Sequence, residues 1–485
     1  MTLVTAACGG DGETSSTTST STGGTGGAST TTSQGGGGAG GAAASFPAPI
    51  VGGTPETDAL STSPARCGQP AFTWLTDAGL GHVTAREDRP GFTAALLSAL
   101  AGAAGIELPA PLQYDVGSHL VTYTTQDRGK KLDATAFVAW PTTVPEGAAP
   151  LPTLMVLHGT SGFTDGCGPS GSSETAMLAA AIASTGYIVV VPDYIGLKGT
   201  DPPTGFKHPY LVGQSVAIAS LDAVRALRDL EVDPAVRLGG ARPSPTLAVI
   251  GGSQGGHATL WVDRLAPYYA RELTLVGAAA TVPPSDLLGQ SLLALSMVRE
   301  SSANMLAFYG ASADWYGAEG KLAEVFVPPL DKDVPLALAA SCDPGDLVDN
   351  ITTLEQVFQP ALLTAATNGT LDALDPWGCM VVENGLTTTG VARIQKDPAS
   401  YGILFATGDQ DALVDTPTER AAYQELCNGG MPMQYLECAG ASHTKVTGWA
   451  LPEILSFIAD RVAGKPFTSS CAVGAPVTCS GTPKP

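Results

Sequence analysis

The stretch Thr246-Leu-Ala-Val-Ile-Gly-Gly-Ser253-Gln-Gly-Gly256 carries the strongest fold signal of this chain. Its apolar first half is typical of a buried strand, and a helical pattern follows to about Tyr269. Between them, the spacing Gly251-x-Ser253-x-Gly255 predicts a sharp strand-to-helix turn that holds the serine Oγ above a sheet. Residues two before and two after the serine approach other backbone closely, so only very small side chains fit there. We therefore expect Ser253 to be a catalytic nucleophile.

Apolar strands alternate with helices around this turn. Strands are expected over 118–125, 134–140, 152–157, 187–191, 246–250, 274–279, 402–406 and 432–436. Further helices are expected over 174–185, 213–230, 416–427 and 448–462. Such interleaving predicts an α/β fold with a mostly parallel central sheet and helices on both faces. Together with the turn at Ser253, it favours the α/β-hydrolase fold.

Composition divides the rest of the chain. Residues 1–8 resemble the end of a bacterial lipoprotein signal, in which small residues precede a lipidated cysteine, here Cys8. Residues 9–45 are almost entirely Gly, Ser, Thr and Ala and predict a disordered tether. The expected hydrolase core comprises 46–282 and 399–466, interrupted by a helical cap insertion over 283–398. Residues 467–485 form a tail that contains two cysteines.

Chain order selects the base. In this fold the nucleophile precedes the acid and the acid precedes the base. His257 and His443 are the two histidines that follow Ser253. His257 lies one turn along the elbow helix, where its ring is expected to pack inside the protein. His443 follows the last expected strand, in a loop, so we expect it to be the general base.

The acid should follow the expected strand over 402–406. Asp409, Asp411 and Asp415 all compete for this role. A carboxylate behind the imidazole must be buried to fix the tautomer. The spacing Gly408-x-x-Asp411-x-x-Val414 favours Asp411, whereas Asp409 is expected to cap the turn and Asp415 the next helix.

Two backbone N–H groups must stabilise the tetrahedral intermediate. The N–H of Gln254 is expected to be one, because it directly follows the nucleophile. The N–H of Thr160, in the loop Leu157-His-Gly-Thr-Ser-Gly162, is expected to be the other. His158 in the same loop is expected to brace it rather than to react.

Charge and cysteine content indicate the compartment and exclude some partners. The chain has a net charge of −21, which disfavours nucleic acid as a partner. It has nine cysteines but no CxxC spacing, so structural disulfides are expected rather than a zinc cluster. Without Cys8, eight cysteines remain. We expect the pairs Cys427–Cys438, Cys471–Cys479, Cys342–Cys379 and Cys67–Cys167, although sequence leaves other pairings open.

Several blocks resemble the secretory lipase family of α/β hydrolases. They are His158–Gly162 with Cys167-Gly-Pro-Ser170, Gly186–Gly196, His208-Pro-Tyr210, Leu221–Ala226 and the elbow. The resemblance implies a Ser253–Asp411–His443 triad, an oxyanion hole and a cap before the acid strand. It also implies structural roles for Asp193 and Asp222. The family often has Tyr where Gly252 stands, which leaves the shape of the acyl pocket open.

The expected activity is hydrolysis of carboxylic esters with a hydrophobic acyl or alcohol group, with no metal or cofactor. The alternatives are a serine peptidase with the same triad and a non-catalytic surface lipoprotein. We expect an extracytoplasmic protein of a bacterium, secreted or tethered to the membrane through lipidated Cys8. A small-molecule or lipid ester is the expected partner.

Overall fold

A computed structural model of the chain describes residues 46–52, 62–63, 67–68, 72–104, 109–348, 351–394 and 398–483. The predicted signal with Cys8 and the predicted tether 9–45 lie outside the described residues. Within the described part of the chain, no helix has the length and apolar character needed to cross a bilayer.

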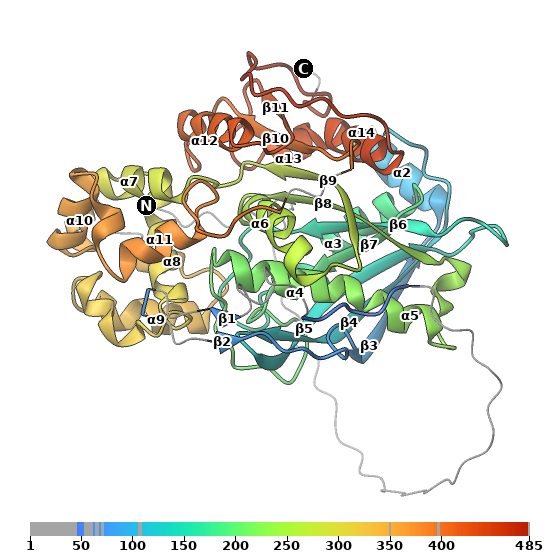
Figure 1. Cartoon of the computed structure of the whole chain (residues 1–485), viewed down its shortest axis with the longest axis horizontal. Helices are drawn as coiled ribbons and strands as arrows, with labels where there is room; N and C mark the ends of the chain where they lie inside the picture. The colour runs from blue at the N-terminus through green and yellow to red at the C-terminus, as the bar shows by residue number, and fades with distance from the viewer. Residues whose placement is uncertain are drawn as a thin grey trace, which may run out of the picture.

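A nine-stranded sheet forms the centre of the molecule (Figure 1). Its strands are β3 (Val83–Phe92), β4 (Val116–Asp127), β5 (Lys130–Pro141), β6 (Leu151–Leu157), β7 (Ile188–Pro192), β8 (Pro243–Gly252), β9 (Thr274–Thr281), β10 (Ile403–Gly408) and β11 (Met433–Cys438). Their order is β11-β10-β9-β8-β6-β7-β5-β4-β3. Pairing is parallel from β11 to β7 and antiparallel from β7 to β3. A separate pair joins β1 (Thr62–Ser63) to β2 (Phe72–Thr73). The mostly parallel sheet expected from the sequence is therefore confirmed.

Helices cover both faces of this sheet. They are α2 (Ala94–Ala104), α3 (Ser173–Ala183), α4 (Gly213–Arg225), α5 (Leu227–Val232), α6 (Gln254–Tyr269), α12 (Thr416–Asn428), α13 (Val446–Trp449) and α14 (Leu451–Val462). Side chains of α4, α6 and α12 pack with one set of strand residues, which includes Met155 and Leu157. Side chains of α2, α3 and α14 pack with the alternate set, which includes Leu154 and Val156. The period of two along β6 thus buries both faces, which explains its continuous apolar sequence.

Along the chain, a group of helices follows β9 and precedes β10; in space it lies at the left of Figure 1. These are α7 (Leu287–Ser296), α8 (Ser301–Ser312), α9 (Leu330–Ala340), α10 (Pro360–Thr367) and α11 (Trp377–Asn384). They enclose a separate core that includes Phe308, Phe358 and Trp377. We call this group of helices, α7 to α11, the cap.

Strand β3 and helix α2 were not expected from the sequence. β3 is an edge strand, and its residues are exposed or only partly buried. Its sequence, VTAREDRPGF, has charged residues and a proline, which obscure a strand pattern. Helix α2 covers the sheet mainly through the buried side chain of Leu97, and one buried position gives no periodic pattern from which a helix can be predicted.

All four predicted disulfide pairings are wrong, although the eight cysteines do form four disulfides. The pairs are Cys67–Cys379, Cys167–Cys342, Cys427–Cys471 and Cys438–Cys479. Cys427, in the last turn of α12, lies near the first residue of β11, whereas Cys438 is its last residue. The ends of this strand are about 17 Å apart, too far for a disulfide. The tail runs beside β11 and supplies a partner at each end.

The two other pairings connect the cap to the body instead of closing within either part. Cys379 on α11 bonds to Cys67, which precedes β2 in the chain, and Cys342 after α9 bonds to Cys167. The Cys167–Cys342 bond packs against the loop after β6, because a Cβ on Gly162 would lie 2.5 Å from the Cβ of Cys167. The predicted Cys342–Cys379 staple fails because both cysteines bond to the body.

Candidate active site

Ser253 occupies a strained turn between β8 and α6. Its φ of +57° and ψ of −121° are rare for a residue with a side chain, and such strain is typical of functional sites. A Cβ on Gly255 would lie 2.1 Å from the carbonyl oxygen of Leu157, and one on Gly251 2.3 Å from the carbonyl oxygen of Gly255. The two glycines therefore allow the close backbone approach that the turn requires.

His443 and Asp411 complete a hydrogen-bond chain that begins at Ser253. The His443 Nε2 lies 2.8 Å from Ser253 Oγ, and its Nδ1 lies 2.8 Å from Asp411 Oδ2. The His443 and Asp411 side chains are 5% and 1% exposed. The structure thus brings together the three residues that the sequence analysis selected from distant parts of the chain. This order of contacts suits proton transfer from the serine to the imidazole.

The competing aspartates have other partners. Asp415 accepts a hydrogen bond from the Thr418 N–H at the start of α12, which confirms its predicted role as a helix cap. Asp409 accepts from the N–H of Gly440 at 2.6 Å, so it braces the loop that carries His443. The second oxygen of Asp411, Oδ1, accepts from the N–H groups of Leu413 and Val414, each at 3.0 Å. These two bonds fix the orientation of the carboxylate.

Gln254 and Thr160 lie where oxyanion donors are expected. Gln254 is the first residue of α6, so its N–H is among those that have no acceptor within the helix. The helix dipole adds partial positive charge at this end. Thr160 is buried in the loop after β6, the strand beside β8, and its hydroxyl lies 3.0 Å from the Tyr210 hydroxyl. Their role as donors to an oxyanion remains a prediction.

The side chain of Gln254 is held by a buried histidine, His208, to which the sequence analysis gave no role. His208 Nδ1 lies 2.9 Å from the Ile195 carbonyl oxygen, which can only accept, so Nδ1 carries a proton. Burial lowers the pKa of His208 to about 3, so the ring is neutral and its Nε2 accepts. The amide Nε2 of Gln254 donates to that atom at 2.8 Å. This fixed chain holds the residue that follows the nucleophile.

A narrow cavity of about 40 Å³ lies beside Ser253 under the cap. Apolar side chains from α7, α8 and the acid loop line it, including Leu287, Met305 and Leu413. Tyr210 and Asn304 also line the cavity, and Asn304 Nδ2 donates to the Tyr210 hydroxyl at 3.1 Å. The cap therefore contributes both apolar walls and a polar contact near Thr160.

The histidines expected to be structural are structural. His158 stacks on Tyr194 with ring centroids 4.1 Å apart, and burial lowers its pKa to about 4. His257 is 1% exposed, and its Nε2 lies 2.8 Å from the carbonyl oxygen of Asn384 at the end of α11. Burial also lowers the His257 pKa to about 4. Both predictions are confirmed.

The two aspartates that the resemblance marked as structural lie inside the body. Asp193 follows β7 and accepts hydrogen bonds from Thr135 at 2.5 Å and from the backbone and hydroxyl of Ser170. Burial raises the pKa of Asp193 to about 6. Asp222 on α4 forms a buried ion pair with Arg225 at 2.9 Å. Neither carboxylate belongs to the Ser253 hydrogen-bond chain.

Gln290 and Glu419 join the cap to the acid loop, and sequence analysis missed both. Gln290 on α7 accepts from the Asp415 N–H at 3.0 Å and donates to Glu419 Oε1 at 2.9 Å. Glu419 is fully buried and also accepts from the N–H and hydroxyl of Ser285, and burial raises its pKa to about 8. The only sequence signal was a polar residue, Gln290, within an apolar helix.

One group of possible metal ligands occurs among the described residues, Cys67 with Cys379 and Glu383. Both sulfurs are consumed in a disulfide, so this group does not offer thiolate ligands.

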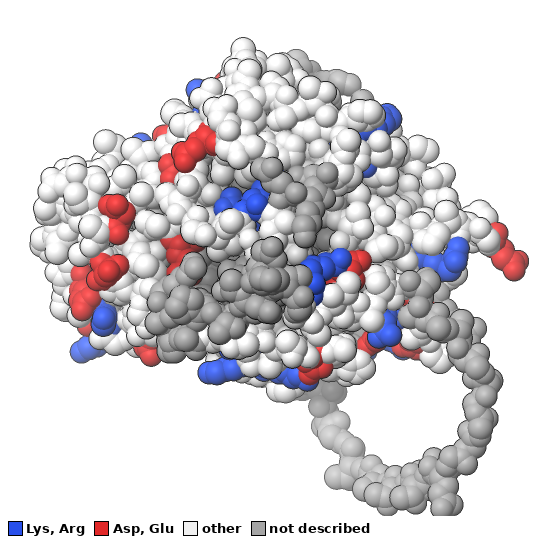
Figure 2. Space-filling model, viewed as in Figure 1, with Lys and Arg blue, Asp and Glu red and all other residues white. Residues whose placement is uncertain are grey.

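Charged side chains on the face in Figure 2 are scattered singly or in small groups, with uncharged surface between them.

The chain is similar to lipases in sequence. Residues 170–292 match the family model described as secretory lipase. A probable inactive lipase of Mycobacterium tuberculosis is 26% identical over 307 residues, or 61% of this chain and 59% of that protein. Lipase 6 of Candida albicans is 26% identical over 299 residues, or 59% of this chain and 58% of that protein. The chain thus spans less than two thirds of the length of these curated relatives.

Solved structures of hydrolases have the same fold. The ligand-bound rice cell wall degrading esterase LipA of Xanthomonas oryzae is 20% identical with a TM-score of 0.62, covering 80% of this chain and 98% of that one. Candida antarctica lipase A in its closed state is 18% identical with a TM-score of 0.58, covering 89% of this chain and 90% of that one. At such identities the likeness shows the α/β-hydrolase fold alone.

Proposed function

Because this chain is related to the secretory lipases and has the α/β-hydrolase fold, we propose that it is a serine esterase with Ser253, His443 and Asp411 as its triad. The observation that carries the proposal is the hydrogen-bond chain from Ser253 Oγ through His443 to Asp411, with both bonds at 2.8 Å. Coming from three separate loops, these groups need independent positioning, so a chance alignment is improbable.

Hydrolysis proceeds in two steps. His443 Nε2 takes the proton of Ser253 as Oγ bonds to the ester carbonyl carbon, and the carbonyl electron pair moves to oxygen. The N–H groups of Gln254 and Thr160 stabilise this oxyanion. The carbon–oxygen bond to the alcohol then breaks, and the alcohol leaves with the proton from His443. Water attacks the acyl-enzyme by the same route, releasing the acid and restoring Ser253.

The apolar cavity supports an ester with a hydrophobic acyl or alcohol group. Leu287, Met305, Leu413 and Val414 face the space beside Ser253. Apolar walls of this kind gain free energy when an apolar group displaces water from them. Initial rates on p-nitrophenyl esters of increasing acyl length would identify the preferred substrate.

Replacing Ser253 with Ala tests the proposal. The variant should lose hydrolysis of p-nitrophenyl butyrate by at least about 10³-fold, because it removes the nucleophile. Its circular dichroism and thermal unfolding should match those of the wild type. Ser98→Ala, at a serine on α2 whose hydroxyl bonds only to Ala94 in its own helix, is the control and should keep full activity. Near wild-type activity of Ser253→Ala would refute the assignment.

The rival functions make different predictions. A serine peptidase would cleave aminoacyl amides faster than the matching esters. A non-catalytic protein, such as the name of the mycobacterial relative suggests for that protein, would cleave neither. The intact hydrogen-bond chain at Ser253 favours a catalyst.

Four disulfides and the match to secretory lipases indicate a protein of an oxidising compartment outside the cytoplasm. We further propose that Cys8 is lipidated and that residues 9–45 tether the enzyme to a bacterial membrane. Mass spectrometry of the N-terminal peptide from the native host tests this, and an unmodified Cys8 would contradict it.

A further inference from the structure

The C-terminal tail gains little from burial, yet it is firmly attached. Of residues 467–483, only Cys479 is fully buried, and Val477 is 49% exposed. Apolar burial therefore contributes little to holding this segment in place. Its attachment depends instead on hydrogen bonds and disulfides, so the positions of those bonds show which segments of the body the tail keeps in place.

Part of the tail is bound to the chain just before His443. The N–H of Val477 donates to the Glu437 carbonyl at 2.8 Å, and its carbonyl accepts from the Ala439 N–H at 2.8 Å. Val477 thus pairs in parallel with Cys438, the last residue of β11. The disulfide Cys438–Cys479 reinforces this pairing. All these bonds lie within six residues of His443.

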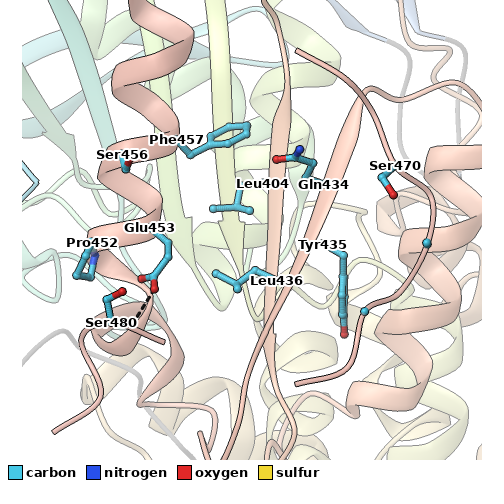
Figure 3. A pocket seen from close by; sticks show the side chains of 12 residues that line it. Leu404, Gln434, Tyr435, Leu436, Pro452, Glu453, Ser456, Phe457, Ser470 and Ser480 are labelled. Carbon is cyan, nitrogen blue, oxygen red and sulfur yellow. Dashed lines mark hydrogen bonds between the residues drawn. The ribbon is translucent and has the colours of Figure 1, made fainter. Parts of the chain in front are cut away.

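The next tail residues are bound to the chain just after His443. The N–H of Gly481 donates to the carbonyl of Trp449, the last residue of α13, at 2.8 Å. A Cβ on Gly481 would lie 2.6 Å from the Gly448 carbonyl oxygen, so only glycine fits there without a shift. The N–H of Ser480 donates to Glu453 Oε1 on α14 at 2.7 Å, which Figure 3 shows as a dashed line.

The loop that carries His443 also contacts the acid loop, on the side that faces away from the tail. Asp409 accepts from Gly440 at 2.6 Å, and the Gln410 N–H donates to the Ala441 carbonyl at 3.1 Å. The loop that carries His443 is therefore held from inside by the acid loop and from outside by the tail. Both outer attachment points come from one short stretch, 477–482.

We propose that residues 477–482, which we call the clasp, are a positioning element that keeps His443 in line between Asp411 and Ser253. This inference rests on the proposed function, because it takes His443 as the base. The clasp touches no reacting atom. It fixes both ends of the loop, so that the imidazole keeps both of its hydrogen bonds. A displacement of about 1 Å in such a group can cost about 10²-fold in rate.

The other tail disulfide holds a different place and supplies a matched control. Cys427–Cys471 joins the tail to the end of α12, where Ser470 also bonds to Met433 at the start of β11. A hollow beside β11 is lined by Gln434 and Leu436 of the strand and by tail residues that lie between Cys471 and Cys479, among them Gly474 (Figure 3). Loss of Cys427–Cys471 should therefore leave the His443 loop in place.

The test compares two double variants of the full chain. Cys438→Ala with Cys479→Ala should lower kcat on p-nitrophenyl butyrate by about 10- to 100-fold with little change in KM. Cys427→Ala with Cys471→Ala should keep kcat within about threefold of the wild type, because the clasp stays intact. In proton NMR, the strongly deshielded His443 Nδ1 proton of the wild type should broaden or disappear only in the first variant. A purely structural disulfide would change thermal stability without a selective effect on that proton.

A glycine pair tests the clasp without removing a disulfide, should the first variant fold poorly. Gly481→Ala should reduce kcat and broaden the same resonance, whereas Gly474→Ala, where a Cβ would meet no atom within 4 Å, should do neither. The clasp is refuted if the wild type shows both activity and the deshielded proton, and Gly481→Ala and the Cys438/Cys479 variant keep both. A wild type with neither property would instead refute the proposed function.

Discussion

Replacing Asp411 with Asn should invert the tautomer of His443. In the wild type, Asp411 Oδ1 accepts from two backbone N–H groups and Oδ2 faces His443 Nδ1. An asparagine keeps its single oxygen toward the two N–H groups, because turning it round would lose two hydrogen bonds of about 1 kcal/mol each. Its NH₂ then faces Nδ1, which must accept. The proton moves to Nε2, and His443 can no longer take the proton of Ser253.

The size of the effect follows from this geometry. The side chain keeps its volume and its two backbone bonds, so the fold should survive. Only the base is lost, and an inverted tautomer lowers kcat by about 10⁴-fold. This corresponds to about 5 kcal/mol of lost transition-state stabilisation.

The assay is kcat for p-nitrophenyl butyrate from pH 6 to pH 9, with thermal unfolding as a check on the fold. Asp409→Asn is the matched control. It keeps an oxygen acceptor for the Gly440 N–H and loses only the charge of that bond, so a loss of about fivefold is expected. The role of Asp411 in fixing the His443 tautomer is refuted if kcat of Asp411→Asn stays within tenfold of the wild type, or if Asp409→Asn lowers kcat more than Asp411→Asn does.

Two further changes test the elbow and the cap. Gly255→Ala places a Cβ 2.1 Å from the Leu157 carbonyl oxygen, so it should lower the free energy of unfolding, measured in urea, by about 1–3 kcal/mol. Gly320→Ala, whose Cβ would meet no atom within 4 Å, should lower it far less. Equal losses in the two variants would contradict the close approach at Gly255. Burial raises the Glu419 pKa to about 8, so the wild type should lose stability as the pH rises from 5 through 8, since ionisation is then penalised only in the folded state. Glu419→Gln should not show this loss of stability. If the melting temperatures of the wild type and the variant change with pH in the same way across that range, the raised pKa of Glu419 is contradicted.

Much of the fold could be predicted from the sequence because its central strands are buried on both faces. Runs such as Ile188–Pro192 and residues 403–406 are apolar throughout, and each lies between turn or helix signals. Strand β3 escaped prediction for the opposite reason, since it is an exposed edge and its sequence is polar. Local pattern thus identifies buried strands and misses exposed ones.

The candidate site was predictable where chain order is informative and hidden where only contact matters. Ser253, His443 and Asp411 follow from the elbow and from their order along the chain. His208 and Gln290 reach the site across the fold. His208 belongs to a block that resembles the family and Gln290 is a polar residue in an apolar helix, but neither signal indicates which residue the side chain contacts. The predicted disulfide pairings were wrong for a similar reason. Pairing depends on where the tail runs along β11, and the distance between cysteines in the sequence does not reveal that.

Reaction of the folded chain with a fluorophosphonate, followed by peptide mass spectrometry, tests directly whether Ser253 is an activated nucleophile. We expect close to one phosphonyl group per chain, on the peptide that contains Ser253, and none when His443 is replaced by Ala. An unmodified Ser253 in the folded wild-type protein would contradict the claim that this serine is an activated nucleophile.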